Sequence, residues 1–214
     1  MRTGRDLEYP LPTRMSETRL TLLPDPHFAA LRPHLAGHLR EVAESISPAN
    51  FASLLDETMK RELQYAFQQV GASEGTVWIV EAESEALVPA FNTGPDAHKM
   101  VNQFRQPLDS GLISMVFASE QTFLENEVWQ NAKQDKALDS KLNKRTHAMI
   151  AVPFYYLGGC RGVISCVILQ EAAAAEPPAT RFDENGKARI RHAATLLGHL
   201  IDHKVLQAVL GTHS

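Results

Sequence analysis

The sequence predicts one domain of the α+β class, in which amphipathic helices pack on a β-sheet. Its strongest signal is an apolar strand hairpin at residues 148–169, where Gly158 and Gly159 separate two β-rich runs. Two amphipathic helical patterns precede the strand region and a long one follows it. With 214 residues, 44% of them hydrophobic, the chain can fill one core.

The N-terminal part divides into an arm and a helix. Residues 1–24 contain three prolines and little helical periodicity, which predicts an extended or partly disordered arm. Asp25-Pro26 then supplies a helix start, and apolar residues recur at three- and four-residue steps to Ile46. We therefore expect a helix over 25–47 and the main domain over 48–210.

The main domain should begin with a second amphipathic helix, with an apolar face from Phe51 to Val70 and Gly71 as its C-cap. A change to β-rich sequence then predicts a hairpin of strands at 76–80 and 87–91. The remaining elements expected, in order, are a short helix at 98–104, a helix at 112–117, a short strand at 122–124, a helical turn within 133–142, the hairpin at 148–169 and a long helix from Asp183 or Glu184.

Composition excludes some functional classes. A net charge of −4 and a pI near 6.1 argue against nucleic-acid binding. The N-terminus lacks the apolar core of a secretory signal, and no apolar run approaches the roughly 20 residues that span a bilayer. Two cysteines are too few for a disulfide framework or a four-cysteine zinc site. We expect a soluble cytoplasmic protein with reduced thiols, no membrane contact and no cofactor.

The order of these elements, together with four segments, resembles the GAF domain family, which is related to PAS domains. The segments are Pro107–Phe117, Arg145–Phe154, Gly162–Leu169 and Phe182-Asp183-Glu184, and the resemblance covers about residues 50–210. It implies an antiparallel sheet of about six strands, with terminal helices on one face and a ligand pocket on the other. Such domains commonly dimerise through those helices, and their ligands differ widely.

No catalytic branch of the family is matched. Cyclic-nucleotide-binding members resemble one another in an Asn-Lys pair and a Phe, where this chain has Gln170-Glu171 and Ala179. Members that reduce free methionine sulfoxide use cysteines in the segments covering the pocket, but residues 92–147 contain none. Cys166 falls in a buried-looking strand and Cys160 at a hairpin tip. We therefore expect a protein that is not an enzyme, with this redox activity as a remote alternative.

Cations and apolar side chains in the segments that cover GAF pockets are candidates for ligand binding. Cationic groups beside aromatic surface suit a small anionic or planar ligand. Solvated surface charge and ordinary core packing explain the same residues. The candidates are Trp78, Lys99, Met100, Phe104, Arg105, Arg145, His147 and Met149.

The terminal helices suggest pairing with a second copy, because the C-terminal apolar stripe is longer than a small sheet needs. Packing on the sheet alone is the competing interpretation. We expect a small-molecule-sensing or regulatory module that forms a homodimer and signals to a separate output protein; the alternative is a ligand-free dimerisation or protein-interaction module. The expected interface residues are Leu31, Leu35, Val42, Leu197, Ile201 and Val205.

Overall fold

The computed structural model describes residues 29–30, 32–174 and 178–211. Its centre is a six-stranded antiparallel sheet in the order β3-β2-β1-β6-β5-β4. The α+β class and the antiparallel sheet of about six strands are thus confirmed. The strands are β1 (Glu74–Glu81), β2 (Ala86–Asn92), β3 (Gln106–Pro107), β4 (Phe123–Glu125), β5 (Lys144–Tyr156) and β6 (Gly159–Glu171).

The predicted hairpin at 148–169 forms the middle of the sheet and is longer than expected. Strands β5 and β6 pair from Lys144↔Glu171 to Tyr156↔Gly159. Leu157 and Gly158 make the turn with positive φ angles of 48° and 77°. The strands are almost continuously apolar because helices cover one face of the sheet and a second apolar cluster covers the other.

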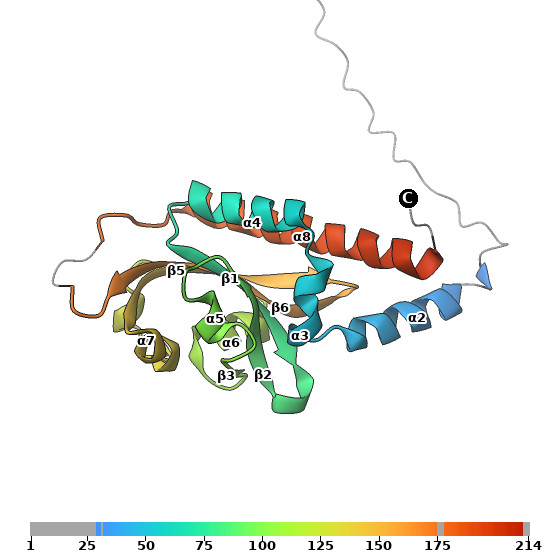
Figure 1. Ribbon diagram of the computed structural model, residues 1–214, viewed down its shortest axis with the longest axis horizontal. Helices are drawn as coiled ribbons and strands as arrows, with labels where there is room; N and C mark the ends of the chain where they lie inside the picture. Colours follow the sequence, from blue (N-terminus) through green and yellow to red (C-terminus); the bar gives the residue numbers. More distant parts are fainter. Residues whose placement is uncertain (1–28, 31, 175–177, 212–214) are drawn as a thin grey trace, which may run out of the picture.

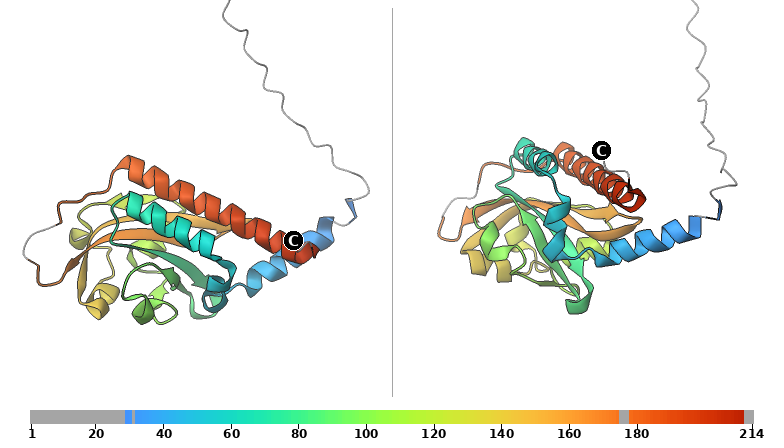
Figure 2. Two further views of the ribbon diagram at one scale, coloured as in Figure 1. Left: turned by 45° about the horizontal axis from the view of Figure 1, so that its top comes forward. Right: turned by 45° about the vertical axis from the view of Figure 1, so that its right-hand side comes forward.

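One face of the sheet carries two long helices that lie side by side, α4 (Glu57–Gln69) and α8 (Glu184–Leu210) (Figures 1 and 2). Phe67 of α4 and Ile190 of α8 are almost completely buried between the helices and the sheet. Helix α8 lies close against β5 at Gly198, because a Cβ there would collide with the carbonyl oxygen of Tyr155. The absence of a side chain at this position therefore permits the close approach of α8 to β5.

Shorter elements cover the opposite face of the sheet, as Figure 1 shows for the helices below it. They pack around a second apolar cluster that includes Trp78, Leu112 and Met149. The family resemblance implied terminal helices on one face of the sheet only. In the structure, α4 and α8 lie on one face and the shorter elements lie on the other. The elements are α5 (Ala97–Met100), α6 (Gly111–Ser119), η3 (Val128–Gln130) and α7 (Ala137–Leu142).

The predicted helix from Phe51 to Val70 is broken in the structure. Short helices α3 (Pro48–Phe51) and η1 (Ala52–Leu54) come first, and Leu55 is extended. The chain then restarts a helix because the side chain of Asp56 accepts a hydrogen bond of 2.9 Å from the backbone N–H of Met59. Apolar periodicity runs through this break because both segments face the same core.

Of the helix expected over 25–47, the described residues show α2 (Arg32–Ser45), beside the C-terminal end of α8 (Figure 2). The arm expected over 1–24 lies outside the described residues. The division at residues 24, 47 and 210 stays a proposal. Within the described part of the chain, no helix has both the length and the apolarity to cross a membrane.

Candidate functional site

A cavity of about 70 Å³ lies between the sheet and the short helices α6 and α7. Strands β1, β5 and β6 form its floor, and α7 with the segment before it forms its roof. Apolar side chains make up much of the wall and polar groups are concentrated on the floor. The lining residues are Glu74, Thr76, Trp78, Met100, Gln106, Leu112, Ile113, Gln134, Asp135, Leu138, Asp139, Leu142, Lys144, Thr146, Met149, Ser165, Val167 and Leu169.

The floor holds polar side chains where a sheet facing a core would normally be apolar. Asn92 donates from Nδ2 to Glu74 Oε1 at 3.2 Å and to Thr76 Oγ1 at 2.9 Å. Trp78 donates from Nε1 to Ser165 Oγ at 2.9 Å. All five side chains are buried. Such a hydrogen-bonded polar floor under an apolar wall is typical of small-molecule sites.

Glu74 is the buried carboxylate of this floor, with 5% of its surface exposed. Burial raises its pKa above the usual value, and the hydrogen bond from Asn92 and the charge of Lys144 offset this only in part. The absence of a side chain at Gly94 lets the carboxylate pack there, since a Cβ would collide with Glu74 Oε2. The cavity thus contains an acid that lacks full charge compensation.

Two carboxylates fasten the roof to the sheet. Asp139 accepts from the backbone N–H of Thr146 at 2.8 Å and from its Oγ1 at 2.7 Å. Asp135 accepts from Gln106 Nε2 at 3.1 Å. Gln134 donates from Nε2 to Asp139 Oδ2 at 2.9 Å, whereas its Oε1 is buried without a hydrogen-bond partner among the described residues. The roof therefore presents an unsatisfied acceptor.

Lys144 is the cation of the lining. It donates from Nζ to Asp96 Oδ2 at 2.8 Å, and this bond raises the pKa of Lys144. The bonds from Lys144 and Lys99 lower the pKa of Asp96 to about 2. Lys144, Gln134 and Asp139 also border an outer hollow of about 530 Å³. These three side chains therefore separate the cavity from a solvent-facing hollow.

Comparison with known proteins identifies the fold. No family model and no curated protein matches this sequence. Among solved structures, the GAF domain/HD domain protein from Geobacter sulfurreducens has 18% identity and a TM-score of 0.54, covering 72% of this chain and 97% of that one. The GAF-B domain of DevS from Mycobacterium smegmatis has 14% identity and a TM-score of 0.51, covering 77% and 99%. The fold is GAF-like.

A free methionine-R-sulfoxide reductase from Neisseria meningitidis has the same fold, with 18% identity, a TM-score of 0.53 and coverage of 84% of this chain and 92% of that one. This comparison corrects the expectation that the present protein is not an enzyme. That expectation was drawn from cysteine positions, but the GAF-like fold itself is shared by enzymes and by other domains. Enzyme activity is thus compatible with the fold.

The two thiols lie away from the cavity of the GAF-like fold. Cys166 is completely buried on the long-helix side of the sheet, and burial raises its pKa to about 12. Cys160 is half-buried at the start of β6, and burial raises its pKa as well. Both environments favour the thiol over the nucleophilic thiolate.

Four of the predicted ligand-binding residues come together at the cavity. Trp78, Met100 and Met149 line it. Phe104 packs edge-on against Trp78, with 6.3 Å between the ring centroids. The sequence thus located part of the apolar wall of the cavity, because the hydrophobic character of these residues is recognised without the tertiary structure.

The predicted cations do not line the cavity. Lys99 is exposed and pairs with Asp96 at 2.7 Å, and Arg105 is exposed and pairs with Glu81 at 2.7 Å. Arg145 is exposed and borders the outer hollow.

His147 is buried and stacks on Trp129, with 4.3 Å between the ring centroids. Neither of its ring nitrogens has a hydrogen-bond partner in the described part of the chain. Burial lowers its pKa, which favours the neutral imidazole.

Sequence reasoning missed the polar floor and the roof. Glu74, Thr76 and Ser165 belong to strands whose apolar neighbours dominate the pattern, and Gln134 and Asp139 belong to a segment that reads as a polar loop. The one available signal was a set of polar residues at alternate positions facing the same side of paired strands.

The expected pairing residues occupy different environments. Leu31 lies outside the described residues, and Leu35 and Val42 are half-buried on α2. Leu197, Ile201 and Val205 are only 3%, 0% and 5% exposed, because this stripe of α8 packs on the sheet of its own chain. The exposed apolar side chains of α8 lie elsewhere on the helix and are Leu196, Leu200, Leu206 and Leu210.

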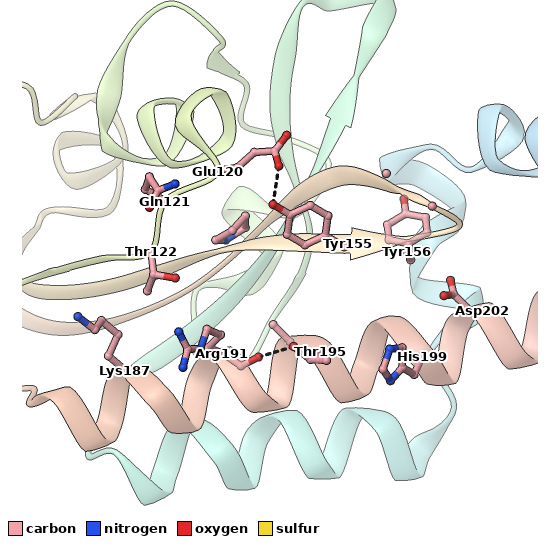
Figure 3. Close-up of a pocket in the computed structure, with 14 residues that line it drawn as sticks. Glu120, Gln121, Thr122, Tyr155, Tyr156, Lys187, Arg191, Thr195, His199 and Asp202 are labelled. Carbon is pink, nitrogen blue, oxygen red and sulfur yellow. Dashed lines mark hydrogen bonds between the residues drawn. The ribbon is translucent and has the colours of Figure 1, made fainter. Parts of the chain in front are cut away.

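A larger groove, of about 730 Å³, runs between α8 and the edge of β5 (Figure 3). Pairing of β4 with β5 ends at Phe123↔Ala151, and Pro153 has no N–H to continue it. In the groove, the hydroxyl of Tyr155 donates to Glu120 Oε2 at 2.6 Å, and Asp202 accepts from the backbone N–H of Leu157 at 2.6 Å. The residues lining this groove include no buried side-chain polar atom that lacks a partner among the described residues, whereas Gln134 Oε1 is such an atom in the smaller cavity. The smaller cavity is therefore the better candidate site.

Proposed function

We propose that this protein is a small-molecule-binding regulatory module with a GAF-like fold. The observation that carries the proposal is the cavity beneath α6 and α7, with Trp78 on its wall and the buried Glu74 and Ser165 on its floor. A buried carboxylate and an unsatisfied amide oxygen cost stability, and they are retained most readily where a ligand satisfies them. The position of the cavity, on the face opposite α4 and α8, leaves those helices free to pair.

Pairing with a second copy is the second part of the proposal. Tyr65, Leu196 and Leu200 are 55%, 46% and 37% exposed. Together with Met59 and Ala193 they border a groove of about 140 Å³ between α4 and α8. Exposed apolar side chains gathered along two neighbouring antiparallel helices favour a two-fold contact with the same helices of another copy. We place the pairing surface on Tyr65, Leu196 and Leu200.

Ligand occupancy would reach a separate output protein through this helix pair. A ligand changes an equilibrium only when it binds two states with different affinity. Strands β1 and β5 line the cavity on one face, and on the other β1 contacts α4 and β5 contacts α8. A small shift of these strands on binding would therefore alter the packing of the paired helices.

The test is a thermal-shift screen of small molecules in positive, negative and neutral charge classes. A ligand at 100 times its dissociation constant stabilises the folded state by about 2.7 kcal/mol. The variant Val167→Phe, which adds bulk inside the cavity, should lose the shift. The control variant Leu206→Phe, which adds bulk at an exposed position of α8, should keep it.

Two outcomes would contradict the proposal. Stabilisation that persists unchanged in Val167→Phe would place the binding outside the cavity. A screen in which no compound stabilises the wild-type protein, while light scattering still reports a dimer, would favour the ligand-free dimerisation module instead.

A further inference from the structure

Among the described residues, the cavity lining includes one buried hydrogen-bond acceptor that has no donor. The amide of Gln134 has a fixed orientation, since its Nε2 donates to the carboxylate of Asp139 and a carboxylate cannot donate in return. Its Oε1 is therefore an acceptor, and this atom is buried without a partner among the described residues. Because Gln134 lines the cavity, a ligand with N–H donors would satisfy it.

The charges of the lining point to the same ligand chemistry. Glu74, Asp135 and Asp139 contribute three carboxylates, against the one ammonium of Lys144. That ammonium donates to Asp96, which lies outside the lining. Burial of Glu74 without a hydrogen-bonded cation raises its pKa, and a cation in the cavity would reverse this.

The size and the wall of the cavity narrow the choice of cation. A volume of about 70 Å³ is several times the roughly 10–15 Å³ that one water requires, which suits an amine with a few carbon atoms. Trp78 adds an aromatic wall that attracts ammonium groups. A metal ion fits less well, because the described residues contain no group of three or more His, Cys, Asp or Glu side chains that could hold one.

We infer that the cavity binds a small molecule through a primary amine, which Glu74 and Gln134 hold while the carbon chain lies along Trp78 and Met149. This inference rests on the proposed function and specifies its ligand. It replaces the anionic or planar ligand expected from the sequence, because Lys99 and Arg105 pair with Asp96 and Glu81 outside the cavity.

The experiment compares three probes of similar shape: propylamine, 1-propanol and propionate. Binding is followed at neutral pH by NMR through the indole N–H of Trp78, assigned with the variant Trp129→Phe. We expect propylamine to shift this resonance with saturation and the other two probes to leave it unchanged. Replacing Glu74 by Gln should weaken propylamine binding at least tenfold, since a hydrogen bond to a charged group contributes about 1.5–3 kcal/mol. The control Glu83→Gln, at an exposed turn, should bind as the wild type does.

The outcomes separate the amine inference from the proposed function. Saturable binding of 1-propanol or propionate in preference to propylamine, lost in Val167→Phe, would overturn the amine inference and leave the proposed function standing. Equal propylamine binding by the wild type and Glu74→Gln, with the variant folded by circular dichroism, would also overturn it. If neither these probes nor any compound of the wider screen perturbs Trp78, the proposed function fails as well.

Discussion

Asp139 accepts two hydrogen bonds from Thr146, one from its backbone N–H at 2.8 Å and one from its hydroxyl at 2.7 Å. The pair joins α7, which roofs the cavity, to β5, which forms part of its floor. Since Asp139 also accepts from Gln134, it holds the unsatisfied amide oxygen of the roof in place. The proposed ligand contacts on floor and roof therefore depend on this connection.

Replacing Thr146 by Val should weaken the connection. The substitution keeps the side-chain shape but removes one donor to Asp139, which should cost about 1–3 kcal/mol of unfolding free energy measured in urea. Hydrogen exchange should rise in α7. The control Thr195→Val removes an exposed bond within α8 and should cost under about 0.5 kcal/mol. Unchanged exchange in α7 would show that the roof is held by other contacts.

Replacing Gly198 by Ala should destabilise the protein, because the new Cβ collides with the carbonyl oxygen of Tyr155. We expect a loss of about 1–3 kcal/mol in denaturant unfolding. The matched control is Gly37→Ala in α2, where the added Cβ has no neighbour within 4 Å and should stabilise by about 0.5–1 kcal/mol. Equal effects of the two substitutions would contradict the close contact between α8 and β5.

The stability difference between Glu74→Gln and the wild type should depend on pH. Burial raises the pKa of Glu74 in the folded protein, so the folded state binds this proton more tightly than the unfolded state does. The wild type therefore loses stability as the pH rises from the unfolded pKa to the folded pKa. Urea unfolding should find the Gln variant relatively more stable at pH 7 than at pH 4; a constant difference would mean that the pKa is unshifted.

A charge on the proposed pairing surface should separate the two copies. We expect Leu200→Arg to shift the protein from dimer to monomer in light scattering, because the arginine would have to be buried between apolar side chains. The control Thr195→Arg places the same charge on the side of α8 that lines the open groove, where it should leave the dimer intact. A monomeric wild-type protein would contradict the pairing proposal.

The sequence predicted the order of the elements well, because strands and amphipathic helices are recognised from local periodicity. The hairpin of β5 and β6 and the start of α8 at Glu184 followed directly. The break at Leu55 was missed because apolar periodicity continues across it. The cavity was predicted only through its apolar wall, since Trp78, Met100 and Met149 carry a hydrophobic signal that Glu74 and Gln134 lack.

The sequence by itself determined the strand pairing in the hairpin and the amphipathic character of the long helices, both of which depend on short-range patterns. The GAF-like class came from the resemblance of four segments and their order to that family. Only the tertiary structure decided which charges face the cavity. Lys99 and Arg105 point to carboxylates elsewhere, whereas Glu74 is held inside by Asn92 and the space at Gly94. The physical reason is that a side chain's direction follows from register and from partners distant in the chain.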